Sequence, residues 1–337
     1  MASLTIDGQV IADVKRKTIL ETALEAGLYI PHLCYHPQLP CPSEMGGGRE
    51  IYQGSQVRRG KDGEAFDGCN LCLVEIEGRE GLFRSCQILI EEGMSVFTDS
   101  TEVKEAREKN LAQILERHPH ACLLCSQANG CDRKVCSSHV PEGERCCALF
   151  GNCELQKVAN CIGMKKGLPP YYPLGIPRIN PEPLISRDYN LCVGCLRCVR
   201  VCKEVRGADV LGFVIEEGRV VVGSKKPTLM ESGCQFCGYC IEVCPAGALM
   251  DRDPGTGERE NYLIPCRNGC PAKINVPSYV RFMKDGELEK ALSVIHERVP
   301  LAGVLGRVCF HPCEANCRRR SLDEPVAICA LKRAAAG

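Results

Sequence analysis

The amino-acid sequence predicts an α+β protein assembled from several small modules rather than from one large core. Of its 337 residues, 27 are cysteine, only 5% are aromatic, and none is tryptophan. The cysteines gather in separate short groups, and stretches with strand-like alternation or helical periodicity lie between these groups. Small cores of this kind need additional stabilisation, and clustered cysteine points to bound metal as its source.

Composition also excludes several classes of protein. The segment Met1–Val10 has no basic stretch followed by an apolar one, so no signal peptide is predicted and the cysteines are expected in a reducing cytoplasm. In that compartment clustered cysteine indicates metal binding rather than disulfides. Lys plus Arg equals Asp plus Glu at 42 each, which argues against a nucleic-acid partner. No apolar run reaches the roughly 18 residues of a membrane helix, so no membrane segment is expected.

The first 100 residues are expected to form a small strand-rich domain. Residues 3–10 alternate around Asp7-Gly8, which predicts a hairpin. Thr18 and Glu21 form a capping box for a helix that stops at Gly27. Residues 40–68 are rich in glycine and charge and are interpreted as a surface insertion, and residues 71–77 as a strand.

Further along the chain, helical and irregular segments alternate. Residues 101–117 have the pattern of an amphipathic helix capped by Thr101. Six prolines within residues 166–185 predict a stiff linker. Residues 275–297 are expected to be helical, and a short Ala-rich helix to follow near residue 330.

The most specific motif is a repeated cysteine run. Four cysteines from Cys192 to Cys202, and four more from Cys234 to Cys244, each have the spacing C-x2-C-x2-C-x3-C of bacterial two-cluster ferredoxins. In those proteins the fourth Cys of each run binds the other cluster. The predicted 4Fe–4S ligand sets are therefore Cys192, Cys195, Cys198 and Cys244 for one cluster, and Cys234, Cys237, Cys240 and Cys202 for the other.

One departure from that pattern is that Lys203, not proline, follows Cys202, whereas Pro245 follows Cys244. We expect the ligand to be unaffected and the local turn to differ. Four thiolates also suit zinc, which is the alternative for each set. Eight cysteines in this double register favour iron–sulfur clusters.

A second group of cysteines has the pattern of a plant-type 2Fe–2S site: Cys69-x2-Cys72, with Cys86 downstream and Cys34 upstream. The segments 31–37, 69–75 and 85–86 resemble the N-terminal domain of the large iron–sulfur subunit of respiratory complex I and the N-terminal region of iron-only hydrogenases. In those families the first two cysteines are much closer together, so residues 40–68 constitute an insertion. Cys41 lies in it and is the alternative to Cys34. The resemblance implies a β-grasp 2Fe–2S domain.

The same resemblance implies a 4Fe–4S site with one histidine ligand. It falls on His118-x3-Cys122-x2-Cys125-x5-Cys131, at the end of the helix expected over residues 101–117. Replacing a thiolate with neutral imidazole makes a cluster less negative and should raise its potential.

The segment that follows departs from the family. An acidic residue, Leu and Gln normally follow the last Cys of the motif, but here they follow Cys153 rather than Cys131. Either residue is therefore a candidate for the fourth ligand. The leftover cysteines suggest a hypothetical additional 4Fe–4S cluster, with structural zinc as the alternative. Its candidate ligands are Cys136, Cys146, Cys147 and Cys153, with Cys161 as a substitute.

The C-terminal cysteines form a further module. Cys266-x3-Cys270-Pro271 and Gly306-Arg307-Val308-Cys309-x3-Cys313-x3-Cys317 resemble the iron–sulfur domain of the glutamate synthase small subunit, with relatives in dihydropyrimidine dehydrogenase and bifurcating transhydrogenases. Those domains hold two 4Fe–4S clusters. The first cysteine pair is missing here, so the resemblance implies one cluster. Its ligands are expected to be Cys270, Cys309, Cys313 and Cys317, with Cys266 or Cys329 as alternatives to Cys317.

These expectations add up to four modules, over residues 1–100, 101–165, 166–255 and 256–337. They are a 2Fe–2S β-grasp domain, a His/Cys 4Fe–4S module, a two-cluster ferredoxin-like domain and a small helical 4Fe–4S domain. The chain is expected to carry one 2Fe–2S and four 4Fe–4S clusters, or five with the additional one. The basic run Arg318-Arg319-Arg320 is interpreted as a solvated loop, with a partner or phosphate site as the alternative.

The function expected from this layout is electron relay without catalysis, because no nucleophile–base pair or nucleotide loop appears outside the metal motifs. The resemblances imply a soluble NAD(P)-linked complex. The expected partners are a flavoprotein NAD(P)H-oxidising subunit of complex I type and a hydrogenase, a formate dehydrogenase or an FAD-containing subunit. The alternative is the N-terminal electron-transfer part of a larger flavin-dependent chain.

Overall fold

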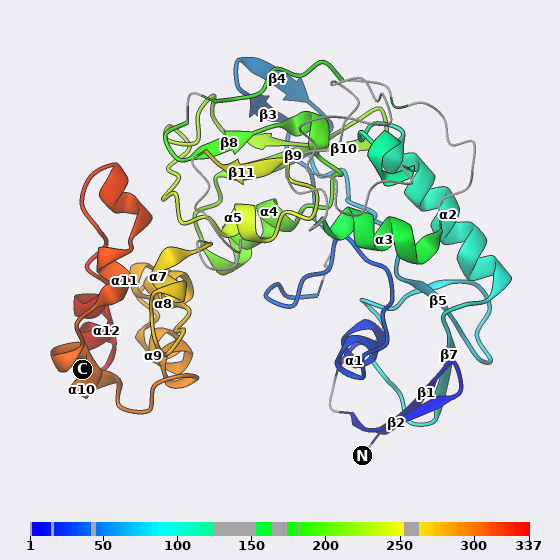
Figure 1. The fold of residues 1–337 in the computed structure, drawn as a ribbon, viewed down its shortest axis with the longest axis horizontal. Helices are drawn as coiled ribbons and strands as arrows, with labels where there is room; N and C mark the ends of the chain where they lie inside the picture. The colour runs from blue at the N-terminus through cyan, green and yellow to red at the C-terminus, as the bar shows by residue number, and fades with distance from the viewer. Residues whose placement is uncertain are drawn as a thin grey trace.

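The structure is a computed structural model that describes residues 2–14, 17–41, 45–124, 153–163, 171, 174–180, 182–252 and 263–337. Figure 1 shows three regions: N-terminal strands at the lower right, a central region built around β8–β11, and C-terminal helices at the left. No helix within the described residues is both long and apolar enough to cross a membrane.

The N-terminal region is a five-stranded sheet with α1 packed on it, in the order β2-β1-β7-β5-β6. The predicted hairpin is confirmed, since Asp7 and Gly8 both have positive φ, at 47° and 84°. The capping box of Thr18 and Glu21 is also confirmed. The elements are β1 (Ala2–Ile6), β2 (Gln9–Val14), α1 (Ile19–Glu25), β5 (Leu73–Ile76), β6 (Phe83–Arg84) and β7 (Met94–Phe97).

Helix α2 (Thr101–Leu115) leads away from this sheet, and α3 (Glu154–Ile162) packs beside it. The expected cap is displaced by one residue, because Ser100 rather than Thr101 caps α2 through a 3.3 Å hydrogen bond from the Val103 amide. The buried Leu111 and Leu115 of α2 share a core with Leu155 of α3. The short η1 (Ala121–Leu124) follows α2.

The central region contains the repeated cysteine runs. Strands β8 and β11 pair antiparallel, and β9 and β10 form a hairpin between the runs. Since Lys203 replaces the proline, helix α4 continues past Cys202 as the π-helical turn η4, whereas α5 ends before Pro245. The bounds are β8 (Ile185–Arg187), η3 (Tyr189–Leu191), α4 (Arg197–Arg200), η4 (Val201–Val205), β9 (Leu211–Glu216), β10 (Arg219–Ser224), α5 (Tyr239–Glu242) and β11 (Leu249–Asp251).

Part of the surface insertion interpreted over residues 40–68 forms strands that pair with the central region. Its strands β3 (Glu50–Gln53) and β4 (Gln56–Arg59) extend the central hairpin into a four-stranded sheet, in the order β4-β3-β10-β9. Figure 1 shows β3 and β4 at the top beside β9, far from β1 and β2. The insertion therefore fastens the N-terminal region to the central one.

The C-terminal region is helical. The helical structure expected over residues 275–297 is confirmed as two helices, α8 (Val276–Lys284) and α9 (Leu288–His296), which are separated at Gly286, whose φ is 76°. The Ala-rich helix is confirmed as α12. The remaining elements are α7 (Pro265–Asn268), α10 (Ala302–Val308), α11 (Pro312–Ala315), η5 (Arg318–Ser321) and α12 (Ile328–Ala335).

Candidate metal centres

The four thiols expected to bind a 2Fe–2S cluster converge in two pairs. The Sγ atoms of Cys34 and Cys69 lie 3.5 Å apart, and those of Cys72 and Cys86 lie 3.4 Å apart. Two thiolates on one tetrahedral metal with bonds of about 2.3 Å lie about 3.8 Å apart, so each pair has nearly the spacing that one iron requires. Hydrogen bonds from the thiols of Cys69 and Cys86 hold the pKa of Cys34 well below its usual value. Hydrogen bonds with Cys34 raise the pKa of Cys69 and of Cys86 above their usual values, so negative charge is favoured on Cys34 rather than on all four thiols.

Local backbone contacts hold these thiols in place. The carbonyl of Cys72 accepts hydrogen bonds from the amide and hydroxyl of Ser85, at 3.0 and 2.7 Å, which bring the Cys86 loop against it. Asn70, between Cys69 and Cys72, has a φ of 51°, and Asn110 of α2 donates to its carbonyl at 2.7 Å. These contacts were not foreseen, because α2 and the loop are remote in sequence.

Cys41, the alternative to Cys34, lies elsewhere. Its side chain is exposed, and its Sγ atom is 3.9 Å from Glu21 Oε1. The structure therefore brings Cys34, and not Cys41, to the other three thiols.

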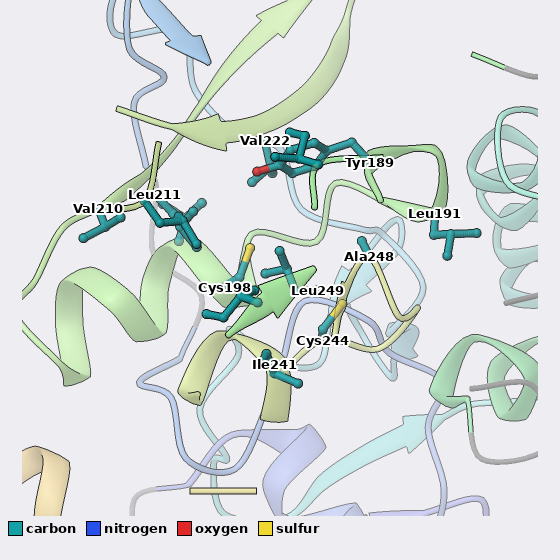
Figure 2. Close-up of a cluster of buried hydrophobic side chains, with 14 of the residues drawn as sticks. Tyr189, Leu191, Cys198, Val210, Leu211, Val222, Ile241, Cys244, Ala248 and Leu249 are labelled. Atoms are coloured by element: carbon teal, nitrogen blue, oxygen red, sulfur yellow. The ribbon is translucent and has the colours of Figure 1, made fainter. Parts of the chain in front are cut away.

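The first ferredoxin-type set surrounds one cavity. Cys192, Cys195 and Cys198 of the first run and Cys244 of the second run all line it, together with Tyr189, Leu196, Val222 and Leu249. Figure 2 shows Cys198 and Cys244 among the buried side chains of this core, near Ala248 and Leu249. Burial raises the pKa of the Cys192 thiol to about 12. Bare thiolates are thus unfavourable here, and bound cationic iron would offset that cost.

The second set surrounds a neighbouring cavity. Its lining includes Cys234, Cys237 and Cys240 of the second run and Cys202 of the first. Backbone amides point at two of these sulfurs, with Val210 N 3.4 Å from Cys202 Sγ and Phe236 N 3.3 Å from Cys234 Sγ. Amide–sulfur hydrogen bonds stabilise negative charge on a ligated cluster and tune its potential. Each cavity thus receives its fourth thiol from the opposite run.

Among the described residues, no group of three or more His, Cys, Asp or Glu side chains is drawn tightly enough around one point to hold a metal ion. In the central region the thiols instead surround volumes walled by apolar side chains.

His118 has the environment of a metal ligand. Its side chain is 3% exposed, and its Nδ1 atom lies 2.9 Å from the Pro119 carbonyl. Its Nε2 atom is buried and has no hydrogen-bond partner among the described residues. Burial lowers the pKa of His118 to about 4, so the ring is neutral at physiological pH. A neutral imidazole held through Nδ1–H, with a free Nε2 lone pair, is the form that binds metals.

The other residues of this site are only partly described. Cys122 follows His118 on η1. Cys153 begins α3, where its thiol lies 3.2 Å from the Pro245 carbonyl, and Cys161 is exposed on the same helix. The remaining candidates lie outside the described residues: Cys125, Cys131, Cys136, Cys146 and Cys147.

Three cysteines of the C-terminal region, Cys266, Cys270 and Cys313, pack in its helical core. Cys266 and Cys317 line a cavity that also reaches Cys237 of the central region, whereas Cys270, Cys309, Cys313 and Cys329 do not line it. Cys313 is buried, and burial followed by the neighbouring Cys270 raises its pKa to about 11. Cys309 accepts a hydrogen bond from His311 N at 3.3 Å, and Cys329 Sγ lies 3.4 Å from the Gly306 carbonyl.

Two arginines between the cysteines of the first run connect the central region to α3 and to the N-terminal region, and neither was predicted from the sequence. Arg197 is fully buried and pairs with Glu154 of α3 at 2.7 Å. Arg200 donates from Nη1 to the Cys34 carbonyl at 3.0 Å. Their position within a run of cluster ligands could have indicated such a role, because a cationic side chain is unusual in a buried cysteine motif.

Comparison with known proteins agrees with this geometry. Three family models match: a 2Fe-2S iron-sulfur cluster binding domain over residues 1–101, the ferredoxin-like domain of NADH-quinone oxidoreductase subunit 3 over residues 182–250, and dihydropyrimidine dehydrogenase domain II, 4Fe-4S cluster, over residues 261–337. The chain is a multi-domain iron–sulfur protein. The resemblances expected from its cysteine motifs are confirmed.

Individual relatives extend these matches. The chain is 24% identical over 327 residues to the NADH-ubiquinone oxidoreductase 75 kDa subunit of Reclinomonas americana, covering 97% of this chain and 40% of that protein. It is 39% identical over 133 residues to the NADP(+)-dependent formate dehydrogenase subunit beta of Moorella thermoacetica, covering 36% and 18%. This iron–sulfur protein therefore spans less than half of the length of either relative.

A solved structure supports the fold. A chain from the crystal structure of an NAD+-reducing [NiFe]-hydrogenase in the H2-reduced state matches with a TM-score of 0.53 and 24% identity, covering 78% of this chain and 93% of that one. At this identity the match shows the fold of the iron–sulfur protein alone.

Proposed function

We propose that this chain is an electron-relay subunit of a soluble NAD(P)-linked oxidoreductase complex. It would pass single electrons between a flavoprotein and a second redox site. The observation that carries this proposal is the exchange of fourth cysteines, which makes two thiol-lined cavities neighbours inside one apolar core. A zinc scaffold has no need of two adjacent buried sites that share their ligand runs.

We assign one cluster to each converging set. Bound clusters supply one-electron couples, and the residues hold them, exclude water and donate hydrogen bonds to sulfur. The proposed ligands are Cys34, Cys69, Cys72 and Cys86 for 2Fe–2S; Cys192, Cys195, Cys198 and Cys244 for one 4Fe–4S; and Cys202, Cys234, Cys237 and Cys240 for the next. The His-ligated 4Fe–4S cluster would use His118, Cys122, Cys125 and Cys131, with Cys153 as the alternative fourth ligand.

Fewer structural observations support the ligands of the C-terminal cluster and of the additional cluster. For the former we propose Cys270, Cys309 and Cys313, with the fourth ligand from Cys317, Cys266 or Cys329. The latter would use Cys136, Cys146, Cys147 and Cys153. The proposed modules cover residues 1–100, 101–165, 166–255 and 256–337.

The partners follow from the relatives. Their names describe NADH-ubiquinone oxidoreductase and NADP(+)-dependent formate dehydrogenase. We therefore propose a flavin-containing NAD(P)H-oxidising subunit at one end of the relay, a hydrogenase, formate dehydrogenase or bifurcating flavin at the other, and a cytoplasmic location, where free thiols persist. A longer chain carrying its own flavin domain is the second candidate, since the relatives are longer. The intact mass of the native polypeptide separates the two.

The test is anaerobic purification with native partners, followed by iron and acid-labile sulfide counts and EPR. The layout predicts about 18 irons per chain, or about 22 with the additional cluster. Cys195→Ser should remove one 4Fe–4S signal, whereas Cys41→Ser should leave every signal unchanged. A colourless protein without acid-labile sulfide, or a purified chain that oxidises NAD(P)H with its own flavin, would refute the proposal.

A further inference from the structure

The central and C-terminal regions meet at an interface that combines apolar packing with specific polar contacts. Tyr239 Oη donates to Asn275 Oδ1 at 2.5 Å, and Arg267 pairs with Glu242 at 2.6 Å. Both pairs join α5, which lies within the second cysteine run and carries Cys240, to the start of the C-terminal region. The C-terminal region is thus docked directly against the second ferredoxin-type cavity.

Arg318 is inserted into this interface. Its side chain is only 12% exposed and pairs with Asp251 of β11, whose side chain is 9% exposed. Its Nη2 atom also donates to the Leu184 carbonyl at 3.3 Å. The expectation that the basic run 318–320 is a solvated loop is therefore wrong for this residue. Its neighbour Arg320 is exposed and donates from Nη1 to the Ala315 carbonyl of its own region at 3.4 Å.

The Arg318 guanidinium lies against the loop that carries two of the second set's thiols. Gly238, between Cys237 and Cys240, has a φ of +86°, and a Cβ atom there would be 2.9 Å from Arg318 Nη1. Only glycine allows both this backbone conformation and so close an approach. One guanidinium nitrogen therefore faces the ligand loop while the other holds Asp251.

A fixed positive charge at this position has a definite consequence. Reduction adds one negative charge to a cluster, and a nearby cation in a poorly screened interior stabilises the reduced form more than the oxidised form. The carboxylate of Asp251 acts in the opposite sense. The two side chains therefore shift the same equilibrium with opposite signs.

We propose that Arg318 of the C-terminal region raises the reduction potential of the cluster held by Cys202, Cys234, Cys237 and Cys240. Docking of the C-terminal region thereby favours that cluster as the electron acceptor within the ferredoxin pair. The cavity shared by Cys237, Cys266 and Cys317 lies in the same interface, so the favoured cluster is the one that borders the C-terminal thiols. This inference rests on the proposed function, since it requires a cluster at the second set.

The test is an EPR-monitored redox titration of the full chain, purified anaerobically. Arg318→Gln should lower the reduced-to-oxidised ratio of the second cluster at a fixed potential about tenfold, which is about 59 mV for one electron. Asp251→Asn should shift the ratio the other way, and Arg318→Lys should stay near the wild-type value. Arg320→Gln, from the same basic run, is the matched control and should change nothing.

The outcomes separate this inference from the proposed function. If the wild-type chain has no second 4Fe–4S signal, the proposed function is wrong and this inference with it. If the signal is present but Arg318→Gln and Asp251→Asn leave its potential unchanged, or shift it in the same direction, only this inference is wrong. If Arg318→Lys and Asp251→Asn both lose the cluster's iron, Arg318 has a structural role and the inference also fails.

Discussion

The clearest quantitative prediction concerns Ile51, which fastens the insertion to the central sheet. Ile51 is 1% exposed and lies over Gly212 and Gly223, a cross-strand pair on β9 and β10. A Cβ atom at Gly223 would be 2.6 Å from Ile51 Cδ1, so the side chain packs on bare backbone. Replacing a buried Ile with Ala costs about 2–5 kcal/mol.

The other contacts that hold the insertion on the central hairpin include hydrogen bonds and an ion pair, since Gly48 N donates to the Phe213 carbonyl at 2.8 Å and Arg58 pairs with Glu216 at 3.5 Å. Gln53 Nε2 donates to the Val222 carbonyl at 2.9 Å, and Ser224 Oγ to the Tyr52 carbonyl at 3.2 Å. Each neutral hydrogen bond contributes roughly 1 kcal/mol. Ile51→Ala should therefore increase the opening equilibrium of the β3–β4 hairpin by roughly 30-fold or more.

Amide hydrogen exchange over residues 50–59 measures this opening directly. Val57→Ala is the matched control, because Val57 lies in the same hairpin and is 41% exposed. Exchange in Ile51→Ala should accelerate over β3, β4 and the facing edge of β10, while Val57→Ala stays close to wild type. Equal exchange rates in the two variants would show that the hairpin is not held by this contact.

Three further predictions concern the sites and their supports. His118→Ala should remove one 4Fe–4S EPR signal and leave the 2Fe–2S signal intact. The buried Nε2 atom of His118 has no hydrogen-bond partner among the described residues, so it is the atom available to bind iron. Glu182→Gln should destabilise the central region by about 3–5 kcal/mol, because it leaves the buried charge of Arg187 without its partner. The measurement is the denaturant concentration at which half of the cluster absorbance is lost, which should fall. Arg200→Leu should speed loss of the 2Fe–2S cluster to a chelator, because it removes the donor to the Cys34 carbonyl.

Each of these has a matched control. His120→Ala changes a neighbouring buried histidine, whose Nδ1 atom lies 3.0 Å from the Leu115 carbonyl, and should retain the cluster. Glu217→Gln changes a carboxylate that is 80% exposed and should leave the midpoint unchanged. Arg49→Leu removes an exposed cation from the insertion, and its chelation rate should match the wild type. A control that behaves like its test variant would contradict the corresponding assignment.

Features that depend on neighbouring residues were predicted more accurately than those that depend on remote ones. The Asp7-Gly8 hairpin and the Thr18–Glu21 capping box were predicted because each depends on residues a few positions apart. Helical structure over residues 275–297 was also predicted, although the break at Gly286 was not. Short-range backbone preferences decide such features, and the sequence displays them directly.

Cysteine spacing by itself determined which thiols belong together. The spacing of bacterial two-cluster ferredoxins, with the fourth Cys exchanged between runs, was enough to group the two sets of thiols that line the central cavities. Only the tertiary structure decided what lies against those sets. The pairing of β3 with β10 and the contact of Arg318 with the Gly238 loop each join residues more than 75 positions apart. Such contacts depend on the packing of whole domains, which no local pattern encodes.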